Sequence, residues 1–293
     1  MASMKKINEE FHIDTRLARL AFERAAATYD NAAVLQRQIN DTMFARLEYI
    51  KTQPTLILDA GAGTGYGTRQ LKTRYRQARV VELDLAHAML MKADVPKRWW
   101  HKSSRRLAVC GNLESLPFQA DCFDMVWSNL ALQWVNDLDG VFKAFNRLLR
   151  ANGLLMFSTF GPDTLKELRA AFSKVDSYTH VHRFIDMHDI GDALMRAGFE
   201  APVMDVEYYT LTYDDVLSLM RELKAIGAHN VAGGRPRGLA GKTLWQRVQS
   251  QYKVQERRYP ATFEVVYGHA WARGYSSKPS DEVRSVIKVH PKI

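Results

Sequence analysis

Short apolar runs alternate with amphipathic segments from about residue 55 to residue 160. The apolar runs predict five strands, at Thr55–Ala60, Arg79–Asp84, Arg106–Cys110, Phe123–Asn129 and Leu154–Thr159. The intervening segments carry apolar residues at helical spacing and predict helices at Thr68–Tyr75, Ala86–Ala93 and Leu138–Arg150. Asn152-Gly153 is expected to end the last helix in a left-handed cap. Such alternation is typical of βαβ units and predicts a mostly parallel sheet.

The two ends of the chain lack this regular alternation of strands and helices. Residues 1–50 predict one or two amphipathic helices ahead of the sheet, which form an N-terminal helical lid segment. After residue 160 we expect helices at Asp163–Lys174, Met187–Ala197, Tyr213–Ile226 and Lys242–Arg257, and strands at Val206–Leu211 and Thr262–His269. The prediction is therefore one α/β domain over 51–275 with a seven-stranded sheet flanked by helices. Inserted helical regions occupy about 161–200 and 213–257, and a flexible tail occupies 276–293.

The composition is that of a globular protein with an uneven charge. The 293 residues are 46% hydrophobic and 25% charged and carry a net charge of +9. Two basic blocks, 51–110 and 231–293, each hold 12 Lys and Arg against 4 Asp and Glu. Two cysteines are too few for a disulfide framework, and no apolar run reaches the length of a membrane span. These features, and the absence of a secretory signal at the start, predict a cytoplasmic protein.

A glycine-rich loop follows the first predicted strand. It reads Asp59-Ala60-Gly61-Ala62-Gly63-Thr64-Gly65, and Asp84 ends the next strand. A carboxylate just ahead of the first glycine, separated from it only by Ala60, repels a pyrophosphate but suits a ligand with an ammonium group. A carboxylate at the second strand end is placed to accept hydrogen bonds from ribose hydroxyls. S-adenosylmethionine has an ammonium group, a ribose and no phosphate, so the arrangement predicts this cofactor.

A third motif, Gly111-Asn112-Leu113-Glu114-Ser115-Leu116-Pro117-Phe118, completes a resemblance to the class I S-adenosylmethionine-dependent methyltransferases, which have a Rossmann-like fold. In that family an aspartate usually stands where this chain has Asn112, whose side-chain oxygen can still accept a bond from the adenine amine. The resemblance implies that the cofactor is bound by Tyr29, Asp59, Gly61, Ala62, Gly63, Gly65, Asp84, Leu85, Asn112, Leu113 and Ser128.

Several other stretches resemble the malonyl-acyl-carrier-protein O-methyltransferases of biotin synthesis. They include 24–30 (RAAATYD), 127–134 (WSNLALQW), 220–228 (MRELKAIGA) and 258–262 (RYPAT). The resemblance implies transfer of a methyl group to the free carboxylate of a malonyl thioester. A carboxylate is already anionic at pH 7 and needs no general base, only a group that orients it. We expect Arg183, Tyr29 and Trp134 at the reaction centre, and Gln133, Arg221 and Lys224 in contact with the substrate or the carrier protein.

The remaining expectations concern partners and alternatives. The basic block at 231–293 is the expected docking surface for malonyl-acyl carrier protein, which is acidic, whereas the block at 51–110 is interpreted as solvated surface beside the cofactor loop. We expect neither nucleic acid nor membrane as a partner. The histidines show no metal-ligand spacing, so no metal is expected, and the protein is expected to be a monomer. Two alternatives stay open. One is methylation of RNA or of a different small molecule. The positive charge suggests RNA, although the chain lacks an N-P-P-Y motif. The other is a respiratory-complex assembly factor that modifies a protein arginine.

Overall fold

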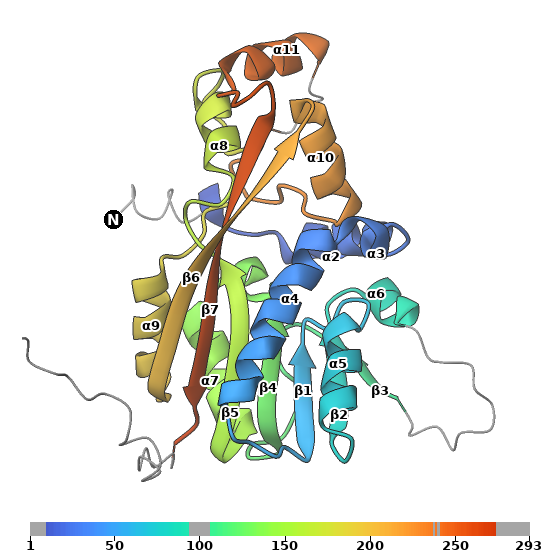
Figure 1. Cartoon of the computed structure of the whole chain (residues 1–293), viewed down its shortest axis with the longest axis vertical. Helices are drawn as coiled ribbons and strands as arrows, with labels where there is room; N and C mark the ends of the chain where they lie inside the picture. Colours follow the sequence, from blue (N-terminus) through green and yellow to red (C-terminus); the bar gives the residue numbers. More distant parts are fainter. Residues whose placement is uncertain (1–9, 94–105, 237, 239–240, 274–293) are drawn as a thin grey trace, which may run out of the picture.

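A seven-stranded sheet organises the chain (Figure 1). The computed structural model describes residues 10–93, 106–236, 238 and 241–273. The strands are β1 (Leu56–Ala60), β2 (Arg79–Asp84), β3 (Leu107–Cys110), β4 (Phe123–Asn129), β5 (Leu149–Phe160), β6 (Glu200–Tyr213) and β7 (Tyr259–Trp271). Their order is β3-β2-β1-β4-β5-β7-β6, and only β7 runs antiparallel to its neighbours. The predicted Rossmann-like, mostly parallel sheet is confirmed.

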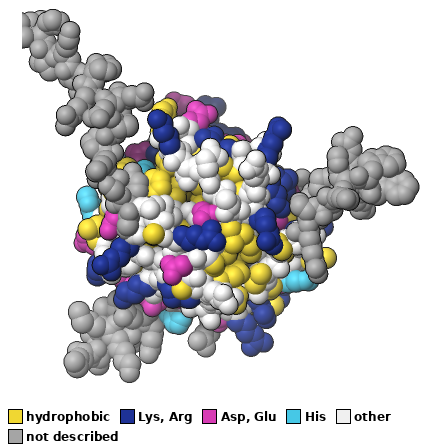
Figure 2. Space-filling view, turned by 90° about the horizontal axis from the view of Figure 1, so that it is seen from below, with side chains coloured by type: hydrophobic (Ala, Val, Ile, Leu, Met, Phe, Trp, Pro, Cys, Tyr) yellow, Lys and Arg dark blue, Asp and Glu magenta, His cyan; other side chains and the backbone are white. Residues whose placement is uncertain are grey.

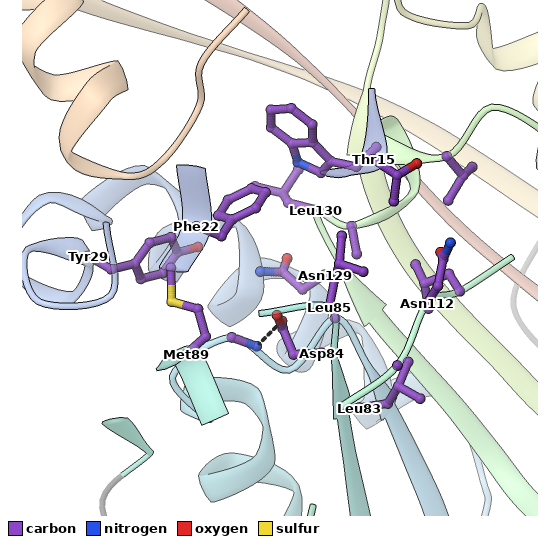
Figure 3. A pocket seen from close by; sticks show the side chains of 17 residues that line it. Thr15, Phe22, Tyr29, Leu83, Asp84, Leu85, Met89, Asn112, Asn129 and Leu130 are labelled. Atoms are coloured by element: carbon purple, nitrogen blue, oxygen red, sulfur yellow. Dashed lines mark hydrogen bonds between the residues drawn. The ribbon is translucent and has the colours of Figure 1, made fainter. Parts of the chain in front are cut away.

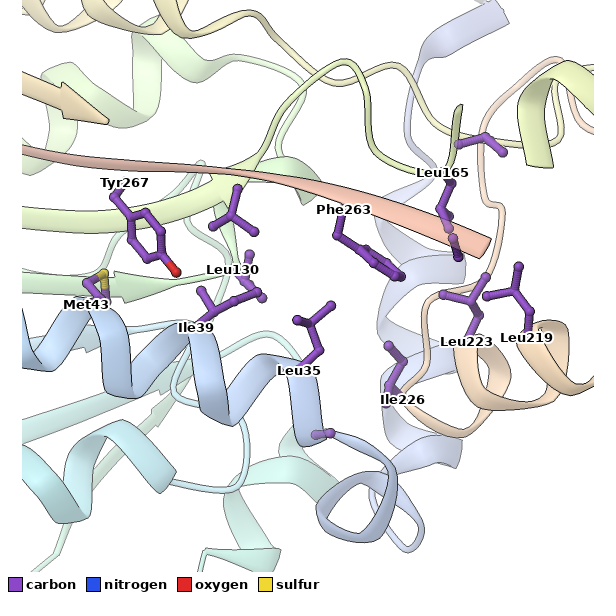
Figure 4. Packing of buried hydrophobic residues seen from close by; sticks show 14 of the residues in the cluster. Leu35, Ile39, Met43, Leu130, Leu165, Leu219, Leu223, Ile226, Phe263 and Tyr267 are labelled. Atoms are coloured by element: carbon purple, nitrogen blue, oxygen red, sulfur yellow. The ribbon is translucent and has the colours of Figure 1, made fainter. Parts of the chain in front are cut away.

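Helices cover both faces of the sheet and create two apolar cores. On one face lie α4 (Val34–Arg46) and α5 (Tyr66–Arg74), and on the other α7 (Leu138–Leu148) and α9 (Met187–Arg196) (Figure 1). Leu35, Ile39 and Met43 of α4 point toward Phe263 and Tyr267 of β7 (Figure 4). The sheet is therefore buried on both sides, as the continuous apolar runs of its central strands require.

A second group of helices lies beyond the carboxyl ends of the parallel strands. There β6 and β7 extend past the sheet toward α8 (Lys166–Ser173), α10 (Val216–Ala225) and α11 (Lys242–Gln251) (Figure 1). We call these three helices the helical cap. Beside the cap lie α2 (Thr15–Ala25) and α3 (Tyr29–Ala32), and α6 (His87–Lys92) packs against α2 and the ends of β2 and β3. The 3-10 helices are η1 (Leu47–Tyr49) and η2 (Leu132–Trp134). The inserted region expected at 161–200 contains two helices. Of these, α8 belongs to the cap, whereas α9 packs against α7 and β6 and so covers the sheet. The tail expected at 276–293 lies outside the described residues.

Several predicted boundaries are wrong, and the sheet explains most of them. The helix expected to reach Arg150 ends at Leu148, and β5 begins at once with Leu149 beside Phe123 of β4. Asn152 does take the left-handed conformation, with φ 64°, but within β5, where the pairing with β4 shifts register. Strands β6 and β7 are longer than expected because they pair with each other over almost their whole length.

One further difference concerns helix length. The helix expected over Lys242–Arg257 ends at Gln251, because residues 255–258 form a turn in which Glu256 and Arg257 have positive φ. Within the described residues, no helix combines the length and apolar character needed to cross a membrane.

Candidate active site

A cleft with about 690 Å³ of empty space opens at the carboxyl ends of β1 to β4 (Figure 3). This is the edge at which parallel α/β sheets bind ligands. The strand ends supply one wall, and α2 and the start of α3 supply the other. The lining residues include Thr15, Phe22, Tyr29, Gly61, Gly63, Leu83, Asp84, Leu85, Met89, Asn112, Leu113, Asn129, Leu130 and Trp134. An adjoining hollow shares Tyr29, Gly61, Gly63 and Asn129 and extends the cleft to Asp59 and Ala62.

The glycine loop turns sharply so that its backbone faces the cleft. Gly61, Gly63 and Gly65 have φ values of 88°, 54° and 77°, a conformation that glycine adopts without strain. A Cβ on Gly61 would lie 2.3 Å from the Ala131 Cβ, whereas a Cβ on Gly63 would meet nothing within 4 Å. Gly61 is therefore needed for close packing of the loop on the segment after β4, and Gly63 opens onto free space.

Asp84 stands at the end of β2 with both carboxylate oxygens held in place. One oxygen accepts the Gly63 N–H and the other the Ala86 N–H, each at 2.8 Å. Figure 3 shows the carboxylate and the first of these bonds at the floor of the cleft. Burial raises the pKa of this carboxyl to about 6 even though both backbone donors lower it. Lone pairs remain on both oxygens, so the group can accept hydrogen bonds from a vicinal diol such as that of ribose.

Asp59 is almost fully buried beneath the glycine loop. Its Oδ2 accepts the Thr68 hydroxyl at 2.5 Å, and no cation pairs with it among the described residues. Burial, with smaller contributions from the Glu82 and Asp84 carboxylates, raises the pKa of Asp59 to about 7. A positively charged ligand beside it would relieve this cost, because an opposite charge favours the ionised form.

A small polar cradle lies next to Asp59, above Gly67. A Cβ on Gly67 would be 2.9 Å from Asn40 Oδ1, 3.0 Å from Trp127 Nε1 and 3.6 Å from Asp59 Oδ2. The indole N–H of Trp127 is buried and has no hydrogen-bond partner in the described structure. Two acceptors and one donor thus surround a space that any side chain on Gly67 would fill. This set matches the ammonium and carboxylate groups at the amino-acid end of S-adenosylmethionine, so the residues present fit the predicted cofactor.

The segment before α4 covers the glycine loop. The Thr64 hydroxyl donates to Asp30 Oδ1 at 2.5 Å, and the Arg37 guanidinium donates to the Asp30 carbonyl. Tyr29 lines both parts of the cleft, where burial and the Asp84 carboxylate raise the pKa of its hydroxyl. Of this segment the sequence motifs had indicated Tyr29 alone. Arg37 falls in a stretch, 35–38 (LQRQ), that also resembles the family, but it is not among the expected cofactor residues, and Asn40 has no local signal because only the packing of α4 beside α5 brings it to the loop.

Three of the predicted cofactor residues have different surroundings from those expected. The side-chain oxygen of Asn112 accepts the Glu114 N–H at 3.1 Å, so it is already partly engaged in its own turn. Ser128 is fully buried, donates its hydroxyl to the Ala60 carbonyl at 2.8 Å and does not line the cleft. Gly65 forms the N-cap of α5 and does not line the cleft either. Ser128 and Gly65 therefore hold the loop from below and do not contact the cleft.

A second, mostly apolar cavity with about 1120 Å³ of empty space lies between the sheet and the helical cap. It is lined by Phe160, Leu165, Leu168, Val181, Phe184, Met220, Leu223, Ile226, Trp245 and Phe263, and by Gln36, Gln133, Thr164, His180, His182, Lys224, His229 and Asn230. Figure 4 shows Leu165, Leu223, Ile226 and Phe263 gathered at this place.

Trp134 separates the cavity from the cofactor cleft, because it lines both. Its indole ring packs edge-on against Phe22 on one side and His182 on the other, with ring centroids 5.1 Å and 5.3 Å away. Gln133 beside it uses its amide to donate to the Leu130 carbonyl at 2.6 Å. The structure thus brings together the expected Tyr29, Gln133 and Trp134 around the junction of two hollows.

The expected arginine is not at this junction. Arg183 is exposed, lies 5.9 Å above the ring of Phe11 and lines neither the cleft nor the cavity. His182 and Phe184 on either side of it line the cavity, whereas the exposed Arg183 lines two neighbouring hollows, one of which it shares with Gln133 and Phe160. Arg221 is also exposed and lines neither hollow, whereas the exposed Lys224 stands at the edge of the cavity.

The two histidines of 180–182 have separate environments. His180 is paired with Asp176 at 2.8 Å and stacked on Phe172, with ring centroids 3.7 Å apart. The Nε2 atom of His182 lies 3.1 Å from the His229 carbonyl and 3.4 Å from the Val231 backbone nitrogen, and its buried Nδ1 has no hydrogen-bond partner among the described residues. In the described part of the chain, no three His, Cys, Asp or Glu side chains form a group that could hold a metal ion.

Comparison with known proteins gives consistent results. Residues 58–157 match a family model described as a methyltransferase domain. Malonyl-acyl-carrier-protein O-methyltransferase from Laribacter hongkongensis is 53% identical over 97% of this chain and 99% of its own length. The protein of that name from Nitrosospira multiformis is 54% identical over 90% and 91%. Among solved structures, the YcgJ protein from Bacillus subtilis superposes with a TM-score of 0.56 at 15% identity and covers 80% of this chain and 98% of its own, which shows a shared fold.

Proposed function

We propose that this chain, which belongs to the malonyl-acyl-carrier-protein O-methyltransferase family, transfers a methyl group from S-adenosylmethionine to the free carboxylate of malonyl-acyl carrier protein. The observation that carries the proposal is the identity of more than half the residues to relatives of that name over nearly the whole chain. The product is the methyl ester of the malonyl thioester. Methylation removes the negative charge of the carboxylate, and the uncharged ester is then used in biotin synthesis.

The cleft residues provide for the cofactor. Bound S-adenosylmethionine supplies an electrophilic methyl group on a positively charged sulfur. Asp59 is placed to meet the ammonium group, Arg37 and the Trp127 indole N–H to meet the carboxylate, and Asp84 to accept from the ribose hydroxyls. The Tyr29 segment covers the amino-acid end and keeps water from it.

The apolar cavity is the proposed site of the acyl thioester. It meets the cofactor cleft at Trp134, so a carboxylate that passes this side chain reaches the cofactor. The malonyl carboxylate is itself the nucleophile, and the reaction neutralises two opposite charges, which a dry site favours. The remaining length of the cavity, lined by Met220, Leu223 and Phe263, suits the uncharged thioester arm of the carrier protein.

Cations near the open side of the cavity are the proposed contact with the carrier protein. Lys224 and Arg221 are exposed on α10, and Arg24 lies in the last turn of α2. The Thr28 hydroxyl just after α2 donates to the Ala225 carbonyl at the end of α10, at 2.8 Å, so the two helix ends are neighbours. A cluster of positive charges around the entrance steers an acidic partner in a salt-dependent way. Part of the basic block at 231–293 lies outside the described residues.

The face at the opposite end of the molecule has a different character. Figure 2 shows Lys and Arg side chains spread singly among apolar and uncharged ones, not as one stripe along the described surface. A nucleic-acid partner calls for such a basic stripe or patch. The charge distribution on this face therefore gives no support to the RNA alternative.

A methyl-transfer assay with radiolabelled cofactor tests the proposal. Malonyl-acyl carrier protein is expected to gain label in a base-labile ester. Acetyl-acyl carrier protein is the matched control, because it lacks only the free carboxylate, and it should remain unlabelled. Label on added tRNA in place of the malonyl protein, or labelling of both carrier proteins alike, would contradict the proposed activity. Expression in a strain without its own malonyl methyltransferase should restore growth without biotin.

A further inference from the structure

We propose that His182 orients the malonyl carboxylate at the Trp134 junction by donating a hydrogen bond from Nδ1, and that its imidazole takes up a proton when the carboxylate binds. This inference rests on the proposed function. It supplies the orienting group that the exposed Arg183 does not supply.

The position of the ring supports this role. His182 lines the apolar cavity, and its ring lies against the edge of Trp134, whose other side contacts Phe22 of the cofactor cleft. A carboxylate at the junction of the two hollows therefore lies beside this imidazole. Two other polar side chains that line the cavity are already engaged, since Gln133 donates to a backbone carbonyl and His180 pairs with Asp176.

The hydrogen bonds of the ring leave one atom for a ligand. Nε2 lies 3.1 Å from the His229 carbonyl and 3.4 Å from the Val231 backbone nitrogen, and we take it to carry the hydrogen that the shorter contact requires. Nδ1 is buried, and in the described structure it has no partner. In the neutral ring it is a bare acceptor, and in the protonated ring it becomes a donor that an anion can satisfy. An unpartnered buried nitrogen costs free energy in the absence of a ligand, which is characteristic of a binding site.

The electrostatic surroundings allow the change of protonation. Burial lowers the pKa of His182 in the free protein, while the His229 carbonyl opposes this effect. The groups that face the region are Lys224 at the end of α10, His229 in the segment after that helix, and the His180–Asp176 pair from the loop before His182. A carboxylate in contact with Nδ1 raises the imidazole pKa, so a proton from solvent is bound together with the substrate.

The same proton uptake lets the protein bind the malonyl carboxylate more tightly than its methyl ester. The imidazolium pairs with the anionic substrate through a charge-assisted hydrogen bond. After methyl transfer the product ester is uncharged, the pKa of His182 falls again and the proton returns to solvent. The contact thus strengthens binding of the free acid relative to the ester. Because the carboxylate keeps most of its charge until the methyl group has moved, the contact stabilises the bound substrate and the transition state almost equally, and its loss should raise KM with little change in kcat.

Two matched variants separate this role from a structural one. His182→Gln keeps an N–H near the Nε2 position for the His229 carbonyl and removes Nδ1, whereas His182→Asn keeps a donor near the Nδ1 position. We expect His182→Gln to raise KM for malonyl-acyl carrier protein about 10- to 100-fold, with kcat within about threefold and cofactor affinity unchanged. His182→Asn should recover part of the loss. His188→Leu, at an exposed position on α9, is the control and should match the wild type.

Proton uptake is the second readout. Malonyl-coenzyme A is titrated into the wild-type protein with S-adenosylhomocysteine present, near pH 7.5, in two buffers of different ionisation enthalpy. The heats should show uptake approaching one proton in the wild type and none in His182→Gln. Unchanged KM in this variant, or equal proton uptake in both proteins, would overturn the inference. An inactive wild type in the assay with malonyl-acyl carrier protein would instead overturn the proposed function itself.

Discussion

Replacing Asp59 with asparagine should stabilise the cofactor-free protein and weaken its binding of S-adenosylmethionine. The carboxyl group is 3% exposed, and burial raises its pKa from 3.8 to about 7. A group whose pKa is higher in the folded than in the unfolded state contributes stability that is lost as the pH rises through the folded value. A pKa rise of this size corresponds to about 4 kcal/mol of stability lost between pH 4 and pH 8. An amide in the same place can still accept the Thr68 hydroxyl and avoids this loss.

The effect on cofactor binding has the opposite sign. Removing one partner of a buried pair costs about 3–5 kcal/mol, so the variant should bind the cofactor at least about 100-fold more weakly at pH 8. In the wild type, only ionised Asp59 pairs with an ammonium group. With a pKa of about 7 the dissociation constant should rise about tenfold between pH 8 and pH 6. Asp84, with a pKa of about 6, adds about a further factor of two, and this smaller dependence alone should remain in Asp59→Asn.

Two measurements check these expectations. Thermal unfolding without cofactor at pH 5 and pH 8 should show a gain in Tm for Asp59→Asn that grows with pH. Calorimetric titration over the same range gives the affinities. Asp192→Asn, an exposed aspartate on α9, is the control for loss of a carboxylate and should behave as the wild type in both. A variant that binds the cofactor as tightly as the wild type, or a gain in Tm that does not change with pH, would refute the reasoning from the buried carboxylate.

Three further changes test other parts of the site. Gly61→Ala should lower the free energy of unfolding by about 1–3 kcal/mol, because the new Cβ would lie 2.3 Å from the Ala131 Cβ; chemical denaturation should show that adding Ala131→Gly restores part of it. Asp84→Ala leaves two backbone N–H donors without their acceptor and should weaken cofactor binding at least about tenfold by calorimetry, with a lower Tm. Lys224→Glu should raise KM for the carrier protein several-fold at low salt, and the difference should shrink at about 0.5 M salt; equal KM values at low salt would remove this residue from the proposed contact.

The sheet was predictable because its strands are distinct in the sequence. Runs such as Leu56–Ala60 and Arg79–Asp84 are mostly apolar, since both of their faces are covered, and each carries an acid at or next to its carboxyl end. The limits of the outer strands were less predictable. Strand β6 is at the edge of the sheet, and alternate residues along it are exposed, so its ends lack an apolar signal. Its length depends on pairing with β7, which only the folded chain contains.

The cofactor cleft was partly predictable for a similar reason. A glycine loop with an acid before it is a local pattern, and the structure places Asp59, Gly61, Gly63 and Asp84 around one cleft. Asn40, by contrast, reaches that cleft only because α4 packs beside α5, a contact between segments almost thirty residues apart in the chain. Arg183 illustrates the converse. Its residue type suited the chemistry, but its side chain is exposed and lines neither the cleft nor the cavity.

The residues that line the apolar cavity have the same sequence pattern as ordinary core residues, so the pattern alone cannot reveal the cavity. Met220 and Leu223 recur at helical spacing on α10, and Leu223 is 8% exposed, so they have the sequence signature of core residues. Helical periodicity states which side chains face inward, but it does not state whether protein atoms fill the space they face. The acids and glycines of the cleft stand out because they conflict with simple packing and cost stability. The substrate side of this site is built from residues that obey the packing rules, so it becomes visible only when the helices are placed around it.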